Sequence, residues 1–174
     1  VVLPDDASAS YARERHDASL SKLGMTMATL TTTADLTAIW QRAAPGPRGW
    51  HVEEKRSGRL ETLADMVDPA HTAFVVIDLQ NDFCHDEALM GRRGEGLRHN
   101  QSILPTVKEM LIAAREAGAM VVHVQAQYGP TSGTPGWLYG REQSSVLEIC
   151  LPGSWGAQQV EELTPLPDEP VVIK

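Results

Sequence analysis

The sequence has few cysteines, few aromatic residues and no long hydrophobic run. Its 174 residues contain two cysteines, Cys84 and Cys150, too few for a disulfide framework, so we expect a reducing, cytoplasmic setting. No uninterrupted apolar stretch approaches the eighteen or so residues of a membrane-spanning helix. The start of the sequence turns polar directly after Val1, Val2 and Leu3, so we expect neither a secretory signal nor a membrane partner.

Positive charge is also scarce. Lysine and arginine number 15 against 23 aspartates and glutamates, which gives a net charge of −8. This charge argues against nucleic acid as the main partner, because a phosphate backbone needs a basic surface. The 42% hydrophobic and 22% charged residues are typical of a globular protein with one domain, or one domain and an arm.

The first seventy residues differ in character from the rest of the chain. Residues 1–24 are polar and poor in large apolar side chains, so we expect a mobile arm or an upstream extension there. Helical spacing of apolar residues predicts a short helix from Thr33 to Ala44 and a further turn from Leu60 to Val67. We interpret residues 1–70 as an N-terminal extension or arm, with Trp40 and Trp50 as packing anchors that hold it on the body, residues 71–174, or on a second subunit.

From His71 onward, short apolar runs alternate with a helical pattern. Ala73–Ile77 and Met120–Val124 are rich in β-branched residues, as is typical of strands buried on both faces of a parallel sheet. Between them, Ser102 as N-cap and Gly118 as the residue after the C-terminus predict a helix. The strand–helix–strand unit implies a parallel pair joined by a right-handed crossover.

The last part of the sequence predicts a short helix from Ser154 to Leu163 and a third strand, Val171–Ile173. The predicted fold class is therefore α/β, a three-layer α/β/α arrangement with a mainly parallel, Rossmann-like sheet. Asp78 and Lys174 directly follow the first and third strands, where such folds place active sites. Because three parallel strands leave a buried-type strand at an edge, we expect residues 71–174 to be the N-terminal part of a larger, C-terminally incomplete domain.

The run from Ile77 to Cys84, Ile-Asp-Leu-Gln-Asn-Asp-Phe-Cys, resembles the opening motif of the isochorismatase-like cysteine hydrolases. The resemblance continues through Gly153-Ser154-Trp155-Gly156 to Lys174, and ureidoacrylate, N-carbamoylsarcosine and biuret amidohydrolases and nicotinamidases are the nearest kinds of relative. That family uses an Asp, a Lys and a Cys as a catalytic triad. The resemblance assigns the first two roles to Asp78 and Lys174. The family's nucleophilic cysteine follows the lysine, so we expect that segment to be absent here and the chain to be inactive alone.

The chemistry of a cysteine nucleophile explains why such a triad contains an aspartate and a lysine. A thiol is mostly protonated at neutral pH, so it needs a base to accept its proton and a positive neighbour that favours the thiolate. The resemblance thus implies cysteine-dependent, cofactor-free hydrolysis of a linear, non-peptide C–N bond in a small amide, ureido or carbamoyl compound. Two alternatives remain: an isochorismatase-type hydrolysis of a vinyl ether without a cysteine nucleophile, and a truncated, non-catalytic domain that binds a ligand or partner.

Four further residues are candidates for substrate binding. Gln80 and Phe83 belong to the motif, and Phe83 either lines the pocket or fills the core. Trp137 and Tyr139 lie in the glycine- and proline-rich segment Gly129–Gly140, which is typical of lids and of subunit contacts. We expect a small-molecule substrate and a homo-oligomer.

Other polar residues and the cysteines are predicted to be structural. Asp82 is expected to bond nearby backbone amides. Cys84 is expected to be a small buried hydrophobe, and Cys150 is also predicted to be structural. His123, inside a strand, is expected to be a core histidine.

The positions of a possible metal site carry the wrong side chains. Nicotinamidases have an aspartate and histidines where this sequence has Ala126, Tyr128 and Ile149. Because none of these is a good metal ligand, we expect no metal, and the difference argues against nicotinamide as substrate.

Overall fold

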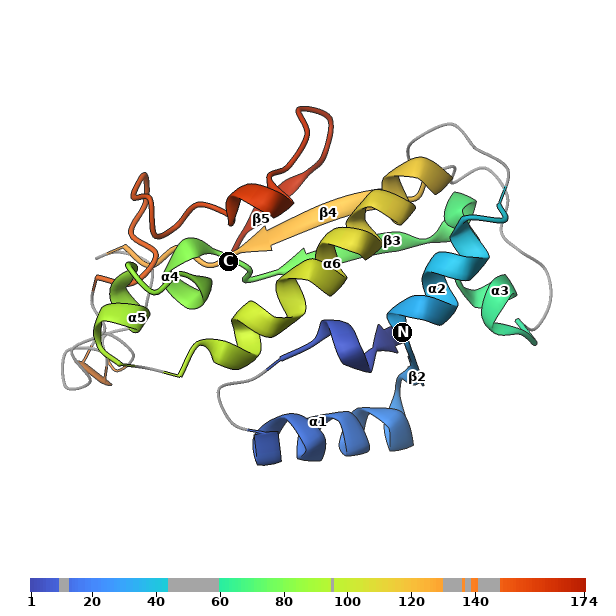
Figure 1. The fold of residues 1–174 in the computed structure, drawn as a ribbon, viewed down its shortest axis with the longest axis horizontal. Helices are drawn as coiled ribbons and strands as arrows, with labels where there is room; N and C mark the ends of the chain where they lie inside the picture. Colours follow the sequence, from blue (N-terminus) through green and yellow to red (C-terminus); the bar gives the residue numbers. More distant parts are fainter. Residues whose placement is uncertain (10–12, 44–59, 95, 130–135, 137–138, 141–147) are drawn as a thin grey trace.

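The computed structural model describes residues 1–9, 13–43, 60–94, 96–129, 136, 139–140 and 148–174. Its central sheet has three parallel strands in the order β3-β4-β5 (Figure 1). These are β3 (Ala73–Ile77), β4 (Met120–Gln125) and β5 (Val171–Ile173). All three strands were predicted, and β4 is one residue longer than expected. The predicted α/β class with a parallel sheet is confirmed.

A long helix joins β3 to β4 and covers one face of the sheet. Helix α6 (Arg98–Ala117) runs in front of both strands in Figure 1, opposite in direction to them. The helix ends as predicted at Gly118, whose φ of 79° is the left-handed conformation that suits glycine. The predicted N-cap at Ser102 is wrong: the helix has Leu97 as its N-cap, five residues earlier, and the hydroxyl of Ser102 donates to the carbonyl of His99 inside the helix (2.8 Å).

The core lies between α6 and this face of the sheet. Side chains that alternate along β3 and β4, such as Val76 and Val121, meet Met110, Leu111 and Ala114 of α6, all nearly inaccessible to water. This burial holds the sheet against the helix.

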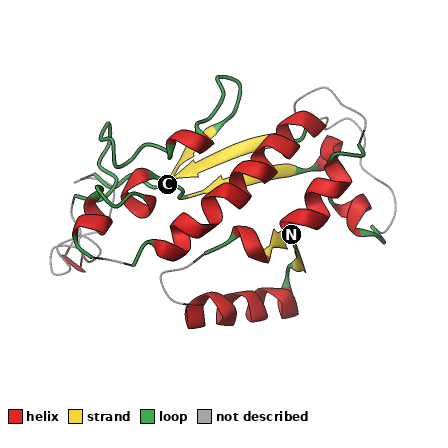
Figure 2. Ribbon diagram, in the orientation of Figure 1, coloured by secondary structure: helices red, strands yellow, loops and turns green. Residues whose placement is uncertain are grey.

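The N-terminal residues form further helices on this side of the molecule (Figure 2). Helix α2 (Thr33–Trp40) packs against α6, and Trp40 donates from Nε1 to the carbonyl of Val67 (2.8 Å) and meets the ring of Phe74 edge-on. Trp40 therefore anchors this region on the body, as predicted, and Trp50 lies outside the described residues. Helix α1 (Arg13–Thr26), in the region expected to be an arm, has no buried residue.

The remaining short elements complete the described fold. Strands β1 and β2 pair in parallel with each other. The bounds are β1 (Val2–Pro4), η1 (Asp5–Ala7), β2 (Thr29–Thr31), α3 (Leu63–Met66), η2 (Pro69–His71), α4 (Asn81–Cys84), α5 (Leu89–Arg92) and η3 (Glu161–Leu163). The helix predicted from Ser154 to Leu163 is wrong, since η3 is the only helical turn there. The segment instead makes tight turns and bridges Gln159 to Gln80.

The second face of the sheet is open in the described part of the chain. Val75, Ile77 and Val172, which register places on this face, are 43%, 53% and 49% exposed. The second helical layer of a three-layer fold is thus not among the described residues. No helix within them is both long enough and apolar enough to span a membrane.

Candidate active site

The structure brings together the two residues that the sequence marks as catalytic. The ammonium Nζ of Lys174 lies 2.7 Å from Oδ2 of Asp78, although 96 positions separate the two residues. The meeting follows from the sheet, because the carboxyl ends of parallel strands lie at one edge. Strand β4 lies between the two residues and binds the backbone of both. Asp78 N–H donates to the carbonyl of Val124, and Lys174 N–H donates to the carbonyl of Gln125, each at 2.9 Å.

Asp78 has an unusual backbone conformation. Its φ is 57°, in the left-handed region that costs most residues roughly 1–2 kcal/mol and that aspartate adopts more readily than others. While Oδ2 binds Lys174, Oδ1 is buried and accepts no hydrogen bond from any described residue. A carboxylate with one oxygen paired and one available can accept a proton from a group placed beside it.

Gln80 fixes the turn that follows Asp78. Its side chain is fully buried, its Nε2 donates to the carbonyls of Ala126 (2.8 Å) and Ala157 (2.6 Å), and its Oε1 accepts from Ala126 N–H (2.8 Å). These bonds join the motif to the end of β4 and to the segment after residue 148. Its predicted contact with substrate stays a prediction.

Asp82 is structural, as predicted. Its two oxygens accept hydrogen bonds from the backbone N–H groups of Leu89 (3.0 Å) and Cys150 (2.7 Å). A Cβ on Gly156 would overlap this carboxylate, so glycine is required for the close approach of the two segments. Asp82 therefore holds together the motif, α5 and the chain around Cys150.

The two cysteines of the chain are not placed as nucleophiles. Cys84 is 3% exposed, and its burial, helped by the charge of Glu162, raises the pKa of its thiol to about 12. Cys150 is fully buried with a φ of 48°, and its Sγ faces the carbonyl of Gly156 at 3.9 Å. Both therefore have the structural character expected from the sequence.

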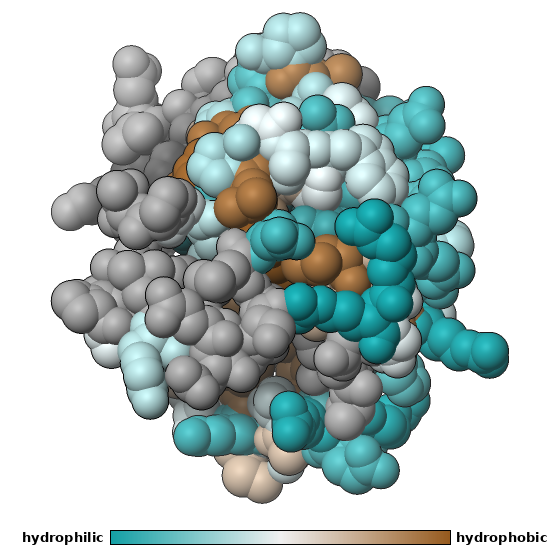
Figure 3. Space-filling view, turned by 90° about the vertical axis from the view of Figure 1, so that its left-hand side faces the viewer, coloured by the Kyte–Doolittle hydropathy of each residue, from teal (hydrophilic) through white to brown (hydrophobic). Residues whose placement is uncertain are grey.

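The other candidate substrate contacts have different placements. Phe83 is half-buried and packs against both hydrophobic clusters of the described chain. Tyr139 is 64% exposed, and Trp137 lies outside the described residues. Figure 3 views the end of the molecule where the strands terminate, and hydrophobic residues show there between hydrophilic ones. Substrate binding by these three residues stays a prediction.

Of the three positions compared with the nicotinamidase metal ligands, two are buried and apolar, and the third holds the half-buried Tyr128. Ala126 is fully buried and Ile149 is 3% exposed, and both provide only hydrocarbon. In the part of the chain that the structure describes, no three His, Cys, Asp or Glu side chains gather to hold a metal ion.

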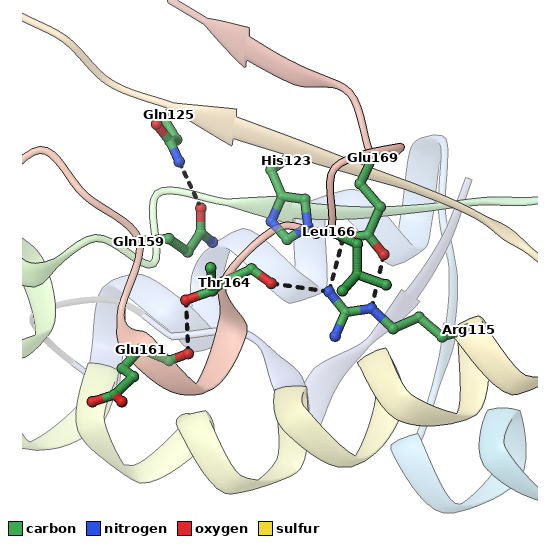
Figure 4. A network of polar contacts seen from close by, with 8 residues as sticks. All are labelled: Arg115, His123, Gln125, Gln159, Glu161, Thr164, Leu166 and Glu169. Atoms are coloured by element: carbon green, nitrogen blue, oxygen red, sulfur yellow. Dashed lines mark hydrogen bonds and ion pairs between the residues drawn. The ribbon is translucent and has the colours of Figure 1, made fainter.

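A buried polar cluster, which the sequence did not reveal, lies beside the start of β5 (Figure 4). Glu169 accepts hydrogen bonds from Arg115 Nε and Nη2 on α6, both at 2.8 Å, and from the N–H of Leu166 at 2.8 Å. Nε2 of the fully buried His123, on β4, lies 3.1 Å from the same carboxylate. Arg115 and Glu169 are 54 positions apart, so no local pattern in the sequence could have paired them.

The surroundings of Glu169 decide its charge state. Burial raises the pKa of this carboxyl, but the hydrogen bonds from Arg115, from Leu166 N–H and from His123 outweigh burial and bring the pKa down to about 2. Glu169 is therefore a carboxylate throughout the neutral range, and it forms a bidentate salt bridge with Arg115.

Comparisons with known proteins indicate the family of this chain. A family model described as the isochorismatase domain matches residues 72–174. The chain is similar to the ureidoacrylate amidohydrolase RutB of Methylobacterium radiotolerans, with 26% identity over 147 residues, which are 74% of this chain and 56% of the relative. It is 29% identical to the RutB ureidoacrylate amidohydrolase of Pseudomonas syringae pv. syringae over 119 residues, 61% of this chain and 49% of that protein.

The chain thus spans about half the length of the curated relatives it matches. The matched residues contain the whole β3-β4-β5 sheet together with Asp78 and Lys174. Since the family model covers more than half of the chain and includes both members of the ion pair, the chain belongs to the isochorismatase family.

Proposed function

We propose that this chain supplies the base and the lysine of a cysteine hydrolase that cleaves a linear, non-peptide C–N bond in a small amide, ureido or carbamoyl compound. The observation that carries the proposal is the Asp78 carboxylate, with Oδ2 on Lys174 and Oδ1 buried and without a partner among the described residues. The relatives named as ureidoacrylate amidohydrolases support the choice of a C–N bond.

In the proposed reaction, Oδ1 of Asp78 accepts the proton of a thiol. The thiolate attacks the substrate carbonyl and forms a tetrahedral oxyanion, which needs hydrogen-bond donors around it. The C–N bond then breaks as the proton held by Asp78 passes to the departing nitrogen. Water, deprotonated by the same carboxylate, hydrolyses the resulting thioester or thiocarbamate and restores the thiol. The ammonium of Lys174 keeps positive charge beside the thiolate throughout.

The thiol must come from polypeptide outside residues 1–174. The chain has only Cys84 and Cys150, and both are buried, with Cys84 held as a neutral thiol by its raised pKa. The relatives are about twice as long as the matched region, which leaves room for a segment that carries the nucleophile. The proposal therefore includes the expectation that residues 1–174 alone do not hydrolyse such substrates.

The test is made in the full-length protein with ureidoacrylate and simple carbamoyl and amide compounds, by measuring ammonia release. We expect Asp78→Asn to lower kcat/KM by at least about a hundredfold, a loss of ~2.7 kcal/mol of transition-state stabilisation. Asp17→Asn, which removes a carboxylate from an exposed ion pair on α1, serves as the control and should leave the rate unchanged.

Retention of more than about a tenth of the rate by Asp78→Asn would exclude Asp78 as the base. Turnover of a vinyl ether without any covalent thiol adduct in mass spectra would support the isochorismatase-type reaction instead. Mass spectrometry of the protein during turnover distinguishes the two, because only the cysteine reaction adds an acyl or carbamoyl group to the enzyme.

A further inference from the structure

One carboxylate holds the turn before β5 from three directions. Glu169 binds Arg115 of α6, His123 of β4 and the N–H of Leu166 in its own turn. The side chain of Glu169 is 8% exposed and that of His123 is inaccessible, so water competes little with these bonds. Arg115 also donates to the carbonyl of Thr164 at 3.1 Å, which ties the start of the same turn to α6.

Strand β5 has few other attachments in the described chain. It is three residues long, pairs only with β4, and each of its residues is 45–49% exposed. Its start is bound where His123 N–H donates to the carbonyl of Pro170, and its end where Lys174 N–H donates to Gln125, each at 2.9 Å. Such a strand gains little from burial, so its position depends strongly on how the preceding turn is held.

The cluster and the candidate active site lie at opposite ends of this strand. Glu169 precedes β5 by two positions and Lys174 follows it directly. His123 contacts the entering chain twice, through its backbone at Pro170 and through its ring at Glu169. A shift of the turn is therefore transmitted along three extended residues to the Lys174 backbone.

We propose that Glu169 is a positioning residue, which ties α6 and β4 to the turn before β5 and thereby sets the Lys174 ammonium against the Asp78 carboxylate. The inference rests on the proposed function, in which that pair prepares the thiol. A displacement of about 1 Å between reacting groups can cost about a hundredfold in rate, so a small movement of β5 matters to the chemistry.

Hydrogen exchange tests the proposal in the chain itself. Glu169→Gln keeps the shape of the side chain and removes its charge. We expect the amides of Lys174 and Gln127, which bond across β4 and β5, to exchange at least about tenfold faster than in the wild type. The amide of Asp78, which bonds to Val124 on the β3 side, is the internal reference and should change much less.

Two further variants sharpen the comparison. Arg115→Lys keeps the positive charge and loses the bidentate contact, so we expect an intermediate acceleration of exchange at the Lys174 and Gln127 amides. If Glu169→Gln does not fold, this variant replaces it in the test. Asp17→Asn removes an exposed carboxylate paired with Arg13 and should leave all these amides unchanged. Equal acceleration of the Lys174 and Asp78 amides would overturn the proposal, because Glu169 would then contribute only to overall stability.

Kinetics of the full-length protein complete the test. We expect Glu169→Gln to lower kcat about tenfold or more and to leave KM within about twofold, since the pair acts on the chemical step. Faster exchange at Lys174 with an unchanged kcat would overturn the positioning role. A fully active Asp78→Asn variant would instead defeat the proposed function, and it would leave the exchange result standing.

Discussion

Three buried or half-buried carboxylates of this chain differ in what their oxygens bind. Both oxygens of Asp82 accept from backbone N–H groups, and Glu169 is saturated by Arg115, His123 and Leu166 N–H. Asp78 alone among the three keeps an oxygen without a partner in the described chain. Hydrogen bonding therefore separates a group that can take a proton from groups that hold the backbone in place.

The buried thiol of Cys84 gives a prediction at the same scale. Because burial raises the pKa of Cys84 to about 12, the native protein should contain almost no Cys84 thiolate at pH 8. We expect iodoacetamide to leave Cys84 unmodified in the native chain and to alkylate it after denaturation in guanidinium chloride, as measured by peptide mass spectrometry. Rapid native alkylation at Cys84 would show that the thiol is accessible and ionised.

The lowered pKa of Glu169 predicts how stability depends on pH. The native carboxyl titrates near pH 2 and the unfolded one near 4.5, so between these values the unfolded chain binds more protons and the native state loses stability as the pH falls. The stabilisation by this carboxylate should be complete above about pH 5 and should vanish as the pH approaches 2. Chemical denaturation of the wild type and Glu169→Gln from pH 6 to pH 2 measures it, and a difference independent of pH would contradict the assignment.

At the scale of elements, the strands could be predicted and some helices could not. Ala73–Ile77 and Val171–Ile173 are apolar, β-branched runs, and Gly118 marks a helix end through a conformation that only glycine adopts easily. The apolar residues of helix α1 do not gather on one face, so periodicity gave no signal for this helix. In agreement with this, none of its residues is buried. The N-cap of helix α6, Leu97, has no side chain that can cap a helix, and therefore Ser102 was mistaken for the N-cap.

The candidate site divides in the same way. The meeting of Asp78 and Lys174 could be predicted because each directly follows a strand and the strands are parallel, whereas their catalytic roles rest on the family resemblance and stay a prediction. The Arg115–Glu169 pair could not, because it depends on how a turn folds back onto a helix 54 residues earlier. The burial of Gln80 could not be predicted from the sequence either. It depends on Ala126 and Ala157, which are distant in the chain and accept hydrogen bonds from the Gln80 side chain.

The contact between Gly156 and Asp82 gives a prediction for the segments that they join. In Gly156→Ala, the new methyl group would overlap the Asp82 carboxylate, which would have to leave the N–H groups of Leu89 and Cys150. We expect the free energy of unfolding to fall by about 1–3 kcal/mol, measured by urea denaturation. Gly96→Ala is the matched control, because a Cβ there meets nothing, and its effect should stay within about 0.5 kcal/mol.

At the scale of the whole molecule, the described residues cover one face of the sheet with helices and leave the other face open. Val75, Ile77 and Val172 form an apolar patch on the open face, and such patches bind hydrophobic dyes and favour association. We expect residues 1–174 to enhance the fluorescence of the dye anilinonaphthalene sulfonate (ANS), and the double variant Val75→Thr, Ile77→Thr to reduce that enhancement by at least about half. Ile112→Thr, at a 45% exposed position on α6, is the control.

An equal loss of dye binding in the control would show that the dye does not report on the open face. Self-association of the chain, expected from the sequence, stays a prediction. Sedimentation of the same variants over a range of concentrations tests it, because substitutions on the open face should lower the apparent mass and Ile112→Thr should not.

The separation of Asp78 and Lys174 along the chain has a consequence for the order of folding. Their ion pair closes a loop of 96 positions, and contacts between distant residues form late because closing a long loop costs entropy before it gains any contact. Strands β3 and β4 can pair while β5 is still undocked, and in such an intermediate Asp78 has no lysine beside it. A growing or partly unfolded molecule therefore lacks the Asp78–Lys174 ion pair until β5 has docked on β4.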